Sequence, residues 1–276
     1  MGRNIVRKLL KNNGYVKRKA LKKKAAGGHV NRNAQFERIA QWQALYDAQG
    51  NPVLSVDTKK KEPIGNLFRE GKLYTTETIE VFDHDFPSLA EGVAVPHTVY
   101  DIKRNEAYVS IGTRRDTSEF ACDSIRHWWR HYGCVHYPLA TSILMLMDGG
   151  GSNSARHWIF KQDLQALAAE IGIEIRIAHY PPYTSKWNPI EHRVFPHITR
   201  ALQGAILTSH QLTKELIETA TTSTGLKVFA CIINKVYETG RKVVEGFKES
   251  MRIVFDPHLG QWNYVAMPKA PAPGVA

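Results

Sequence analysis

Residues 142–148, SILMLMD, form a continuous apolar run of strand length that ends in an aspartate. Such a run is typical of a central strand that is covered on both faces of a sheet. Apolar residues then recur at helical spacing within residues 154–171, and Gly172 follows as a helix stop. The alternating run IEIRI at 173–177 completes a strand, helix and strand, which predicts two parallel strands joined by a helix.

The residues before this unit predict antiparallel strands and one helix. PVLSVD (52–57) and GNLF (65–68) favour a first hairpin across a polar turn, and HTVYDI (97–102) and EAYVSIG (106–112) favour a second antiparallel pair. A helix is expected from about residue 116 to 132. Up to this point the chain therefore predicts hairpin strands followed by a helix.

The two ends of the chain predict further helices. A short helix is expected at 4–13, one begins at Pro189, and another lies near 211–222. Taken in order, three hairpin-type strands followed by alternating helices and strands indicate an α/β fold, a mixed sheet with helices on both faces. This is the order of a ribonuclease H-like domain.

Bulk composition is compatible with one large domain in a reducing compartment. The chain has 276 residues, 43% of them hydrophobic, and no apolar run approaches the roughly 20 residues of a membrane span. Its basic N-terminus lacks the apolar stretch of a signal peptide. Three widely spaced cysteines, Cys122, Cys134 and Cys231, suit free thiols. We therefore expect a cytoplasmic protein that does not bind membranes.

The net charge of +11 is concentrated at the N-terminus. Residues 1–38 hold 12 Lys/Arg and one acid, Glu37, whereas residues 39–276 hold 25 basic and 25 acidic side chains. A basic arm on a neutral body is typical of nucleic-acid binding, although a solubilising tail has the same composition. The candidate DNA contacts in the arm are Lys17, Arg18, Lys19, Lys22, Lys23 and Lys24. We expect an arm at 1–38, a domain at 39–264 and a disordered tail at 265–276.

Three carboxylates fall at positions where ligands bind in α/β proteins. Asp57 and Asp148 each end an apolar strand, and the carboxyl ends of strands form the ligand-binding edge of such sheets. In PPYTSKWNPIEHRVF (181–195), Asn188 can cap a helix with Glu191 reaching back as its capping-box partner. Each acid alone could be structural. Together they could converge on one rim, where carboxylates could hold a pair of Mg²⁺ or Mn²⁺ ions for phosphodiester chemistry.

The motif string resembles a known family. NPIEHRVF after a proline-containing turn resembles the last-acid motif of DDE/D transposases, such as the Tc1/mariner group. The wider string VDTKKKEPIGN, DGGGSNS, HYPPYTSKWNPIEHRVF, TSTGLKV and GQWNY is similar to the Rhodopirellula-type transposase DDE family of bacterial insertion sequences. This likeness runs from about residue 31 to 264.

The resemblance implies an activity and its residues. Asp57, Asp148 and Glu191 would be the catalytic, metal-binding acids, with two Mg²⁺ or Mn²⁺ ions as cofactors. The implied reaction is metal-dependent nicking of double-stranded DNA at transposon ends, followed by attack of the freed 3′-hydroxyl on target DNA, with a homodimer on the DNA. Members of the family extend further at the N-terminus, so residues 1–38 are expected to be the remnant of a DNA-binding region.

Other side chains are candidates with structural alternatives. Lys59 and Lys61 follow Asp57 at strand spacing and could hold DNA phosphates, as could Lys186 and Arg193 beside Glu191. Each could equally be a solvated surface charge. The four residues His127, His131, Cys134 and His136 lack the paired spacing of structural zinc sites.

Two further functional interpretations remain open from the sequence. One is a different nuclease of the same fold that acts on RNA–DNA hybrids or junctions. The other is a remnant that only binds DNA. A protein that only binds DNA would not cleave it, whereas a transposase and a nuclease both would. Only a transposase would join the freed 3′ end to a second duplex.

Overall fold

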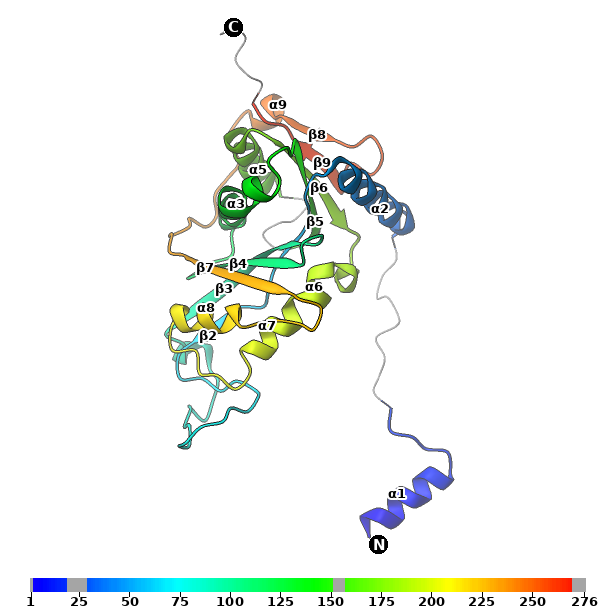
Figure 1. Ribbon diagram of the computed structural model, residues 1–276, viewed down its shortest axis with the longest axis vertical. Coiled ribbons are helices and arrows are strands. Elements are labelled where there is room, and N and C mark those ends of the chain that lie inside the picture. The colour runs from blue at the N-terminus through cyan, green and yellow to red at the C-terminus, as the bar shows by residue number, and fades with distance from the viewer. Residues whose placement is uncertain (1, 19–28, 151–156, 270–276) are drawn as a thin grey trace.

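The computed structural model describes residues 2–18, 29–150 and 157–269 (Figure 1). Within these ranges, nine strands form one mixed sheet in the order β7-β4-β3-β1-β5-β6-β9-β8, with β2 paired to β3. The strands are β1 Val53–Thr58, β2 Glu62–Ile64, β3 Gly92–Asp101, β4 Glu106–Gly112, β5 Ser142–Asp148, β6 Glu174–Tyr180, β7 Lys227–Ile233, β8 Ile253–Phe255 and β9 Asn263–Ala266.

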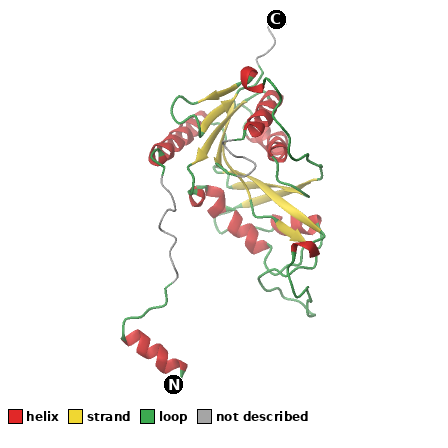
Figure 2. Cartoon of the chain, turned by 180° about the vertical axis from the view of Figure 1, so that it is seen from behind, coloured by secondary structure: helices red, strands yellow, loops and turns green. Residues whose placement is uncertain are grey.

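Helices lie on both faces of this sheet (Figure 2). The α-helices are α1 Arg3–Asn12, α2 Arg32–Gln49, α3 Ser118–Trp128, α4 Cys134–His136, α5 Trp158–Ile171, α6 Pro189–Arg193, α7 Phe195–Ala201, α8 His210–Glu218 and α9 Phe247–Ser250. Short 3₁₀ turns occur at Pro87–Leu89 and Ser185–Trp187. The expected α/β architecture, with a mixed sheet covered on both sides, is confirmed.

Strand β1 occupies the centre of the sheet. It pairs antiparallel with β3 and parallel with β5, and β5 in turn pairs parallel with β6. The predicted parallel strands on either side of α5 are therefore confirmed. Because β1 and β5 run in the same direction, their carboxyl ends meet at one edge of the sheet.

The side chains of β1 alternate between two hydrophobic cores. Leu54 and Val56 pack with α3 and α5 on one face, whereas Val53 packs with α2 on the other. Ser55 lies between Leu54 and Val56 and therefore faces the α2 side, as does Asp57. A further core on this side joins α6, α7 and α8 to β3 and β4.

The expected first hairpin is wrong. Residues 65–68 are not a strand, and β2 pairs with β3 rather than with β1. The reason is that both edges of β1 are already occupied by β3 and β5. Lys59 and Lys61 consequently lie beyond the last residue of β1, so strand alternation does not relate them to Asp57.

Helix α2 has no counterpart among the expected elements. Its polar sequence hides a buried face, on which Gln35 and Ile39 are 0% and 3% exposed. The boundary expected after residue 38 therefore falls inside a helix that packs on the sheet.

The helix expected at 116–132 is present but is not α-helical throughout. Helix α3 ends at Trp128, and the chain stays helical through a π-helical turn at Trp129–Gly133 and through α4. The buried rings of Phe120 and Trp128 anchor α3. Such wide turns insert one extra residue per turn and rotate the side chains that follow.

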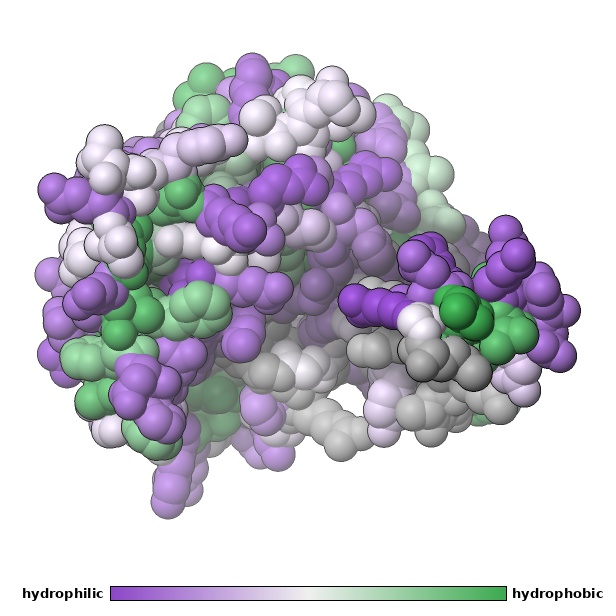
Figure 3. Space-filling model, turned by 90° about the horizontal axis from the view of Figure 1, so that it is seen from below, coloured by the Kyte–Doolittle hydropathy of each residue, from purple (hydrophilic) through white to green (hydrophobic). Residues whose placement is uncertain are grey.

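On the face shown in Figure 3, apolar side chains are exposed on two segments of a largely hydrophilic surface. Seen from below (Figure 3), hydrophobic side chains gather on the β2–β3 connection, where Phe68 and Phe86 are exposed, and on α1, where Leu9 and Leu10 are exposed. No residue of α1 is buried. In the described part of the chain, no helix is both long and apolar enough to span a membrane.

Candidate active site

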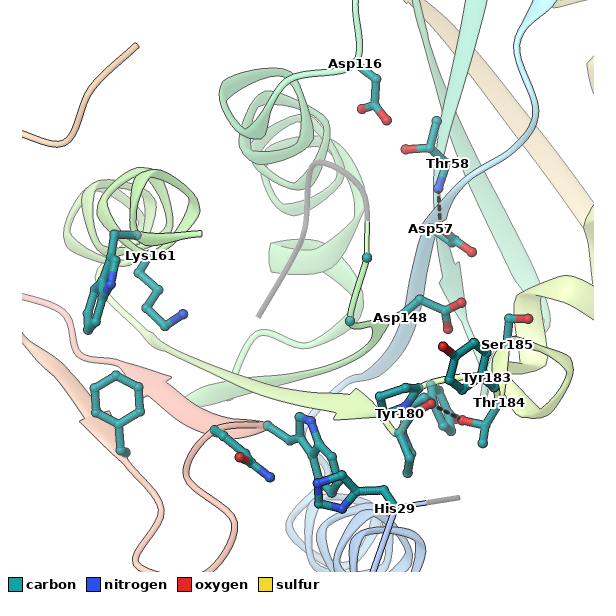
Figure 4. Close-up of a pocket in the computed structure, with 18 residues that line it drawn as sticks. His29, Asp57, Thr58, Asp116, Asp148, Lys161, Tyr180, Tyr183, Thr184 and Ser185 are labelled. Atoms are coloured by element: carbon teal, nitrogen blue, oxygen red, sulfur yellow. Dashed lines mark hydrogen bonds between the residues drawn. The ribbon is translucent and has the colours of Figure 1, made fainter. Parts of the chain in front are cut away.

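Asp57 and Asp148 lie level with each other at the carboxyl ends of β1 and β5. The parallel register pairs Val56 with Met147, so the aspartates that follow lie side by side (Figure 4). Both line a cavity of about 990 Å³. The parallel pairing of β1 with β5 therefore brings both carboxylates to one cavity.

Glu191 approaches the carboxyl ends of β1 and β5 from α6; this edge of the sheet is called the rim below. Ile190 is fully buried in the core beneath α6, which fixes the first turn of that helix against β1. Glu191 itself is half-buried and does not line the cavity. Its carboxylate is nevertheless close enough for the Asp148 charge to contribute, after burial, to raising the pKa of Glu191.

The aspartates resist ionisation. Burial, followed by the charge of Asp148, raises the pKa of Asp57 to about 7, with smaller increases from Glu191 and Asp116. The Thr58 backbone N–H donates to Asp57 Oδ1 at 2.7 Å and partly opposes this pKa increase. The acids of the rim therefore repel one another, which is the situation that a bound cation would relieve.

Burial also raises the pKa of Asp148, against a lowering effect from one hydrogen bond. That bond comes from Asn188, whose Nδ2 lies 3.3 Å from Asp148 Oδ1. On the other side of Asp148, its backbone carbonyl lies 3.2 Å from Nδ1 of the buried His179. The second acid is thus held both through its carboxylate and through its backbone.

The expected capping box is wrong. Asn188 does occupy the position before α6, but its side chain makes no capping bond. Its backbone N–H donates to Ser185 O at 2.8 Å, so it is not available to Glu191. The capping contact comes instead from Ser55, whose Oγ accepts the Ile190 N–H at 3.2 Å. The carboxylate of Glu191 therefore has no role as a capping-box partner.

Helix α2 supports the loop that precedes α6. Phe36 contacts Trp187 and Tyr180, with ring centroids 6.0 and 6.2 Å away. Gln35 donates to the backbone carbonyl of His179 at 2.8 Å and exchanges hydrogen bonds with Asn263. This support was not predicted from the sequence, in which α2 is largely polar and buries Gln35 beside Ile39 and Tyr46.

The far wall of the cavity is aromatic and basic. Lys161 projects from α5 across from the aspartates (Figure 4), with Nζ 4.7 Å from the Tyr264 ring centroid. Burial lowers the pKa of Lys161 to about 8. Asp116, a fourth acid, also lines the cavity. Sequence reasoning missed Lys161 and Asp116, since neither belongs to a motif.

The expected basic contacts have different surroundings. Lys59 is 7% exposed and forms an ion pair with Glu62, so its charge already has a partner. Lys61, Lys186 and Arg193 are exposed. Of the arm residues, Lys17 and Arg18 are exposed. The remaining four lie outside the described residues: Lys19, Lys22, Lys23 and Lys24.

The His/Cys cluster near α3 makes local contacts. His131 Nδ1 lies 2.9 Å from the carbonyl of His127, and Cys134 bonds to the carbonyl of Arg130. His136 faces Glu106 instead, at 3.7 Å. The His127 and His131 rings also stack, with centroids 4.0 Å apart, whereas Cys134 and His136 point at other partners.

The carboxylates suit a hard divalent cation by their chemistry. No three His, Cys, Asp or Glu side chains among the described residues form a ready-made metal-binding group. Asp57, Asp148 and Glu191 offer only oxygen donors, which Mg²⁺ and Mn²⁺ prefer. Burial raises the pKa of all three carboxyls, and the charge of Asp148 raises the pKa values of Asp57 and Glu191 further, which a bound cation would offset. The donor set therefore fits these metals.

This sheet, with two aspartates at adjacent strand ends and a glutamate entering a helix beside them, defines a ribonuclease H-like domain. The chain belongs to the family described as the Rhodopirellula transposase DDE domain, whose sequence model matches residues 1–268. The resemblance seen in its motifs is thereby confirmed.

Solved structures agree on the fold. The chain is similar to the mariner Mos1 paired end complex with Mg, with a TM-score of 0.52, 12% identity, and coverage of 77% of this chain and 60% of that chain. It is also similar to a pre-cleavage Mos1 transpososome, with a TM-score of 0.50, 12% identity, and coverage of 77% and 61%. The chain thus spans about three fifths of the Mos1 chains. No curated protein matches it.

Proposed function

We propose that the chain catalyses DNA transposition: it nicks DNA at transposon ends and transfers the freed 3′-hydroxyl to target DNA. The observation that carries this proposal is the convergence of Asp57, Asp148 and Glu191 from three separate elements on one rim. Membership of a transposase DDE family supports the same reaction class.

In this proposal the three acids hold two Mg²⁺ or Mn²⁺ ions, which would polarise the scissile phosphate and activate the attacking oxygen. Asp57 and Asp148 present their carboxylates from rigid, adjacent strands, so the distance between them is set by the sheet. Glu191 completes the oxygen donor set from the helix entrance. Hydrolysis gives a 3′-hydroxyl, and that hydroxyl then displaces a 3′-oxygen in the target strand.

The exposed cations are proposed to hold the DNA backbone. Lys61 follows β1, which carries Asp57, and Lys186 and Arg193 flank Glu191 in the sequence; the basic arm adds Lys17 and Arg18 together with Lys19, Lys22, Lys23 and Lys24. One of the similar Mos1 structures is a paired end complex with Mg. We infer that this chain likewise acts as a homodimer on two DNA ends, in the bacterial cytoplasm.

Supercoiled plasmid carrying the DNA that flanks this reading frame tests the proposal. Purified protein with Mg²⁺ should nick at the element boundaries and join the 3′ ends to a second, labelled duplex. Nicking without joining would indicate a nuclease of the same fold. Binding without nicking, in both Mg²⁺ and Mn²⁺, would indicate a protein that only binds DNA.

A further inference from the structure

A fully buried amide connects the elements that carry the three acids. Asn188 is 0% exposed, although asparagine is mostly found at protein surfaces. Its Nδ2 donates to Asp148 Oδ1 at 3.3 Å, and its Oδ1 accepts a hydrogen bond from Ser55 Oγ. Asn188 is therefore bonded to both central strands, β5 through Asp148 and β1 through Ser55.

Ser55 extends this connection to the third acid. It is 0% exposed and lies two residues before Asp57 on the same face of β1. Its hydroxyl hydrogen goes to Asn188, and its oxygen accepts the backbone N–H of Ile190, the residue before Glu191. One hydroxyl thus fixes the entrance of α6 to the strand that carries Asp57.

The chemistry of this position requires a carboxamide. The Asp148 carboxylate can only accept, so the atom facing it must be a donor, whereas the Ser55 hydroxyl donates and needs an acceptor. An aspartate at 188 would offer acceptors only. A serine or threonine could cap α6 but offers a single short hydroxyl. Only a carboxamide of this length supplies a donor for Asp148 and an acceptor for Ser55 at the same time.

Helix capping does not account for the residue. Asparagine is favoured before helices because its side chain bonds the first free N–H groups, yet that of Asn188 makes no such bond. Ser55 makes the capping contact instead. The amide of Asn188 is used entirely on Ser55 and Asp148.

We propose that Asn188 is a positioning residue for the carboxylate site: it orients Asp148 directly and, through Ser55, holds the α6 entrance that presents Glu191. This proposal rests on the proposed function. Groups that orient metal ligands typically contribute 10- to 100-fold to metal affinity or activity. The contribution should therefore appear in the binding of the metal, even without DNA.

The test compares Asn188→Ala, Ser55→Ala, the double variant and Ser142→Ala. Ser142 is the matched control, because it is a buried strand serine, bonded to Tyr46 at 2.6 Å, at the opposite end of β5 from Asp148. Mn²⁺ affinity is measured without DNA by electron paramagnetic resonance or calorimetry. Nicking is measured across Mg²⁺ concentrations, and urea unfolding midpoints report folding.

Asn188→Ala and Ser55→Ala should each weaken Mn²⁺ binding about 10-fold and raise the Mg²⁺ concentration for half-maximal nicking equally. The maximal rate should change much less. Because Asn188 and Ser55 are joined in one hydrogen-bonded unit, the loss in the double variant should be well below the sum of the two single losses. Ser142→Ala should lower the unfolding midpoint and leave Mn²⁺ affinity unchanged.

Three outcomes would overturn the proposal in different ways. Unchanged Mn²⁺ affinity in Asn188→Ala would mean that Asn188 contributes only to folding, and it would leave the proposed transposase function intact. Additive losses in the double variant would overturn the link through Ser55. Failure of the unaltered chain to bind Mn²⁺ or to nick DNA would overturn the proposed function, and this inference with it.

Discussion

The His29 ring contacts the Trp262 ring edge-on, with centroids 4.6 Å apart. His29 is the first described residue after segment 19–28 of the basic arm, and both rings line the cavity that holds Asp57 and Asp148. The arm therefore joins the body at the edge of the acid cavity. The start of the body and the two aspartates therefore border the same cavity.

Deleting residues 1–28 should weaken DNA binding and flatten its salt dependence. This deletion removes ten Lys/Arg and no acid, and it keeps His29 and all of α2. If the arm neutralises on the order of five phosphates, the slope of log K against log salt should fall by about 4 to 5. Fluorescence anisotropy with one duplex at several salt concentrations measures this slope.

The unfolding midpoint serves as the control for this deletion and should not change, because no residue of α1 is buried. An unchanged slope would mean that the neutral body holds the DNA by itself.

Asp57→Asn and Asp148→Asn should each abolish Mg²⁺-dependent cleavage without unfolding the protein. Each change removes a charged oxygen ligand and keeps the size of the side chain. Asp47→Asn, an exposed acid near the end of α2, is the matched control and should cleave normally. Plasmid nicking assays measure the effect, and a variant that cleaves at the unaltered rate would remove that aspartate from the site.

Metal-free protein should lose stability as the pH rises from about 4 to 7. The pKa of Asp57 is raised from 3.8 to about 7, so between these values the folded state retains a proton that the unfolded state releases. Each tenfold difference in proton affinity is worth about 1.4 kcal/mol, so the full effect is a few kcal/mol. Urea unfolding with a chelator at pH 5 and pH 8 measures it.

The matched variant for this pH effect is Asp57→Asn, in which the loss of stability between pH 5 and pH 8 should largely disappear. Added Mg²⁺ should restore stability to the unaltered chain at pH 8, since a ligand bound only by the folded state stabilises it. An equal pH dependence of stability in both proteins would show that ionisation of Asp57 does not destabilise the folded state.

Glu191→Gln should keep normal stability and lose cleavage by more than about 100-fold, which exceeds the effect of groups that only orient a ligand. The Asn188 N–H is already bonded to Ser185 O, so the glutamate contributes no capping bond that stability could depend on. Paired unfolding and nicking measurements test this. Full turnover in the variant would leave Glu191 without a role at the rim.

Regular periodicity explains what could be predicted from the sequence. The run 142–148 and the helix after it have strong, local patterns, and the parallel pair β5 and β6 follows directly from them. The two aspartates could be found because each ends such a strand. By contrast, the partner of β1 depends on which strands compete for its two edges, and no local pattern encodes that competition.

The connections behind the acids could not be predicted for a related reason. Asn188 precedes a helix and thus matches a capping signal, yet its partner Ser55 is 133 residues away in the sequence. Helix α2 was missed because its sequence is largely polar, and its buried face combines Gln35, which is held in a polar network, with Ile39 and Tyr46 of a hydrophobic core. Long-range polar contacts leave no periodic signature.

The pairing of β9 with β6 has a consequence for self-association. β9 lies antiparallel along the outer side of β6, and β8 covers β9 in turn. Chains that end before residue 253 would leave the backbone N–H and C=O groups on the outer side of β6 unpaired. Such an open edge is a template for pairing with other chains, so shortened copies should aggregate even though all three acids are present.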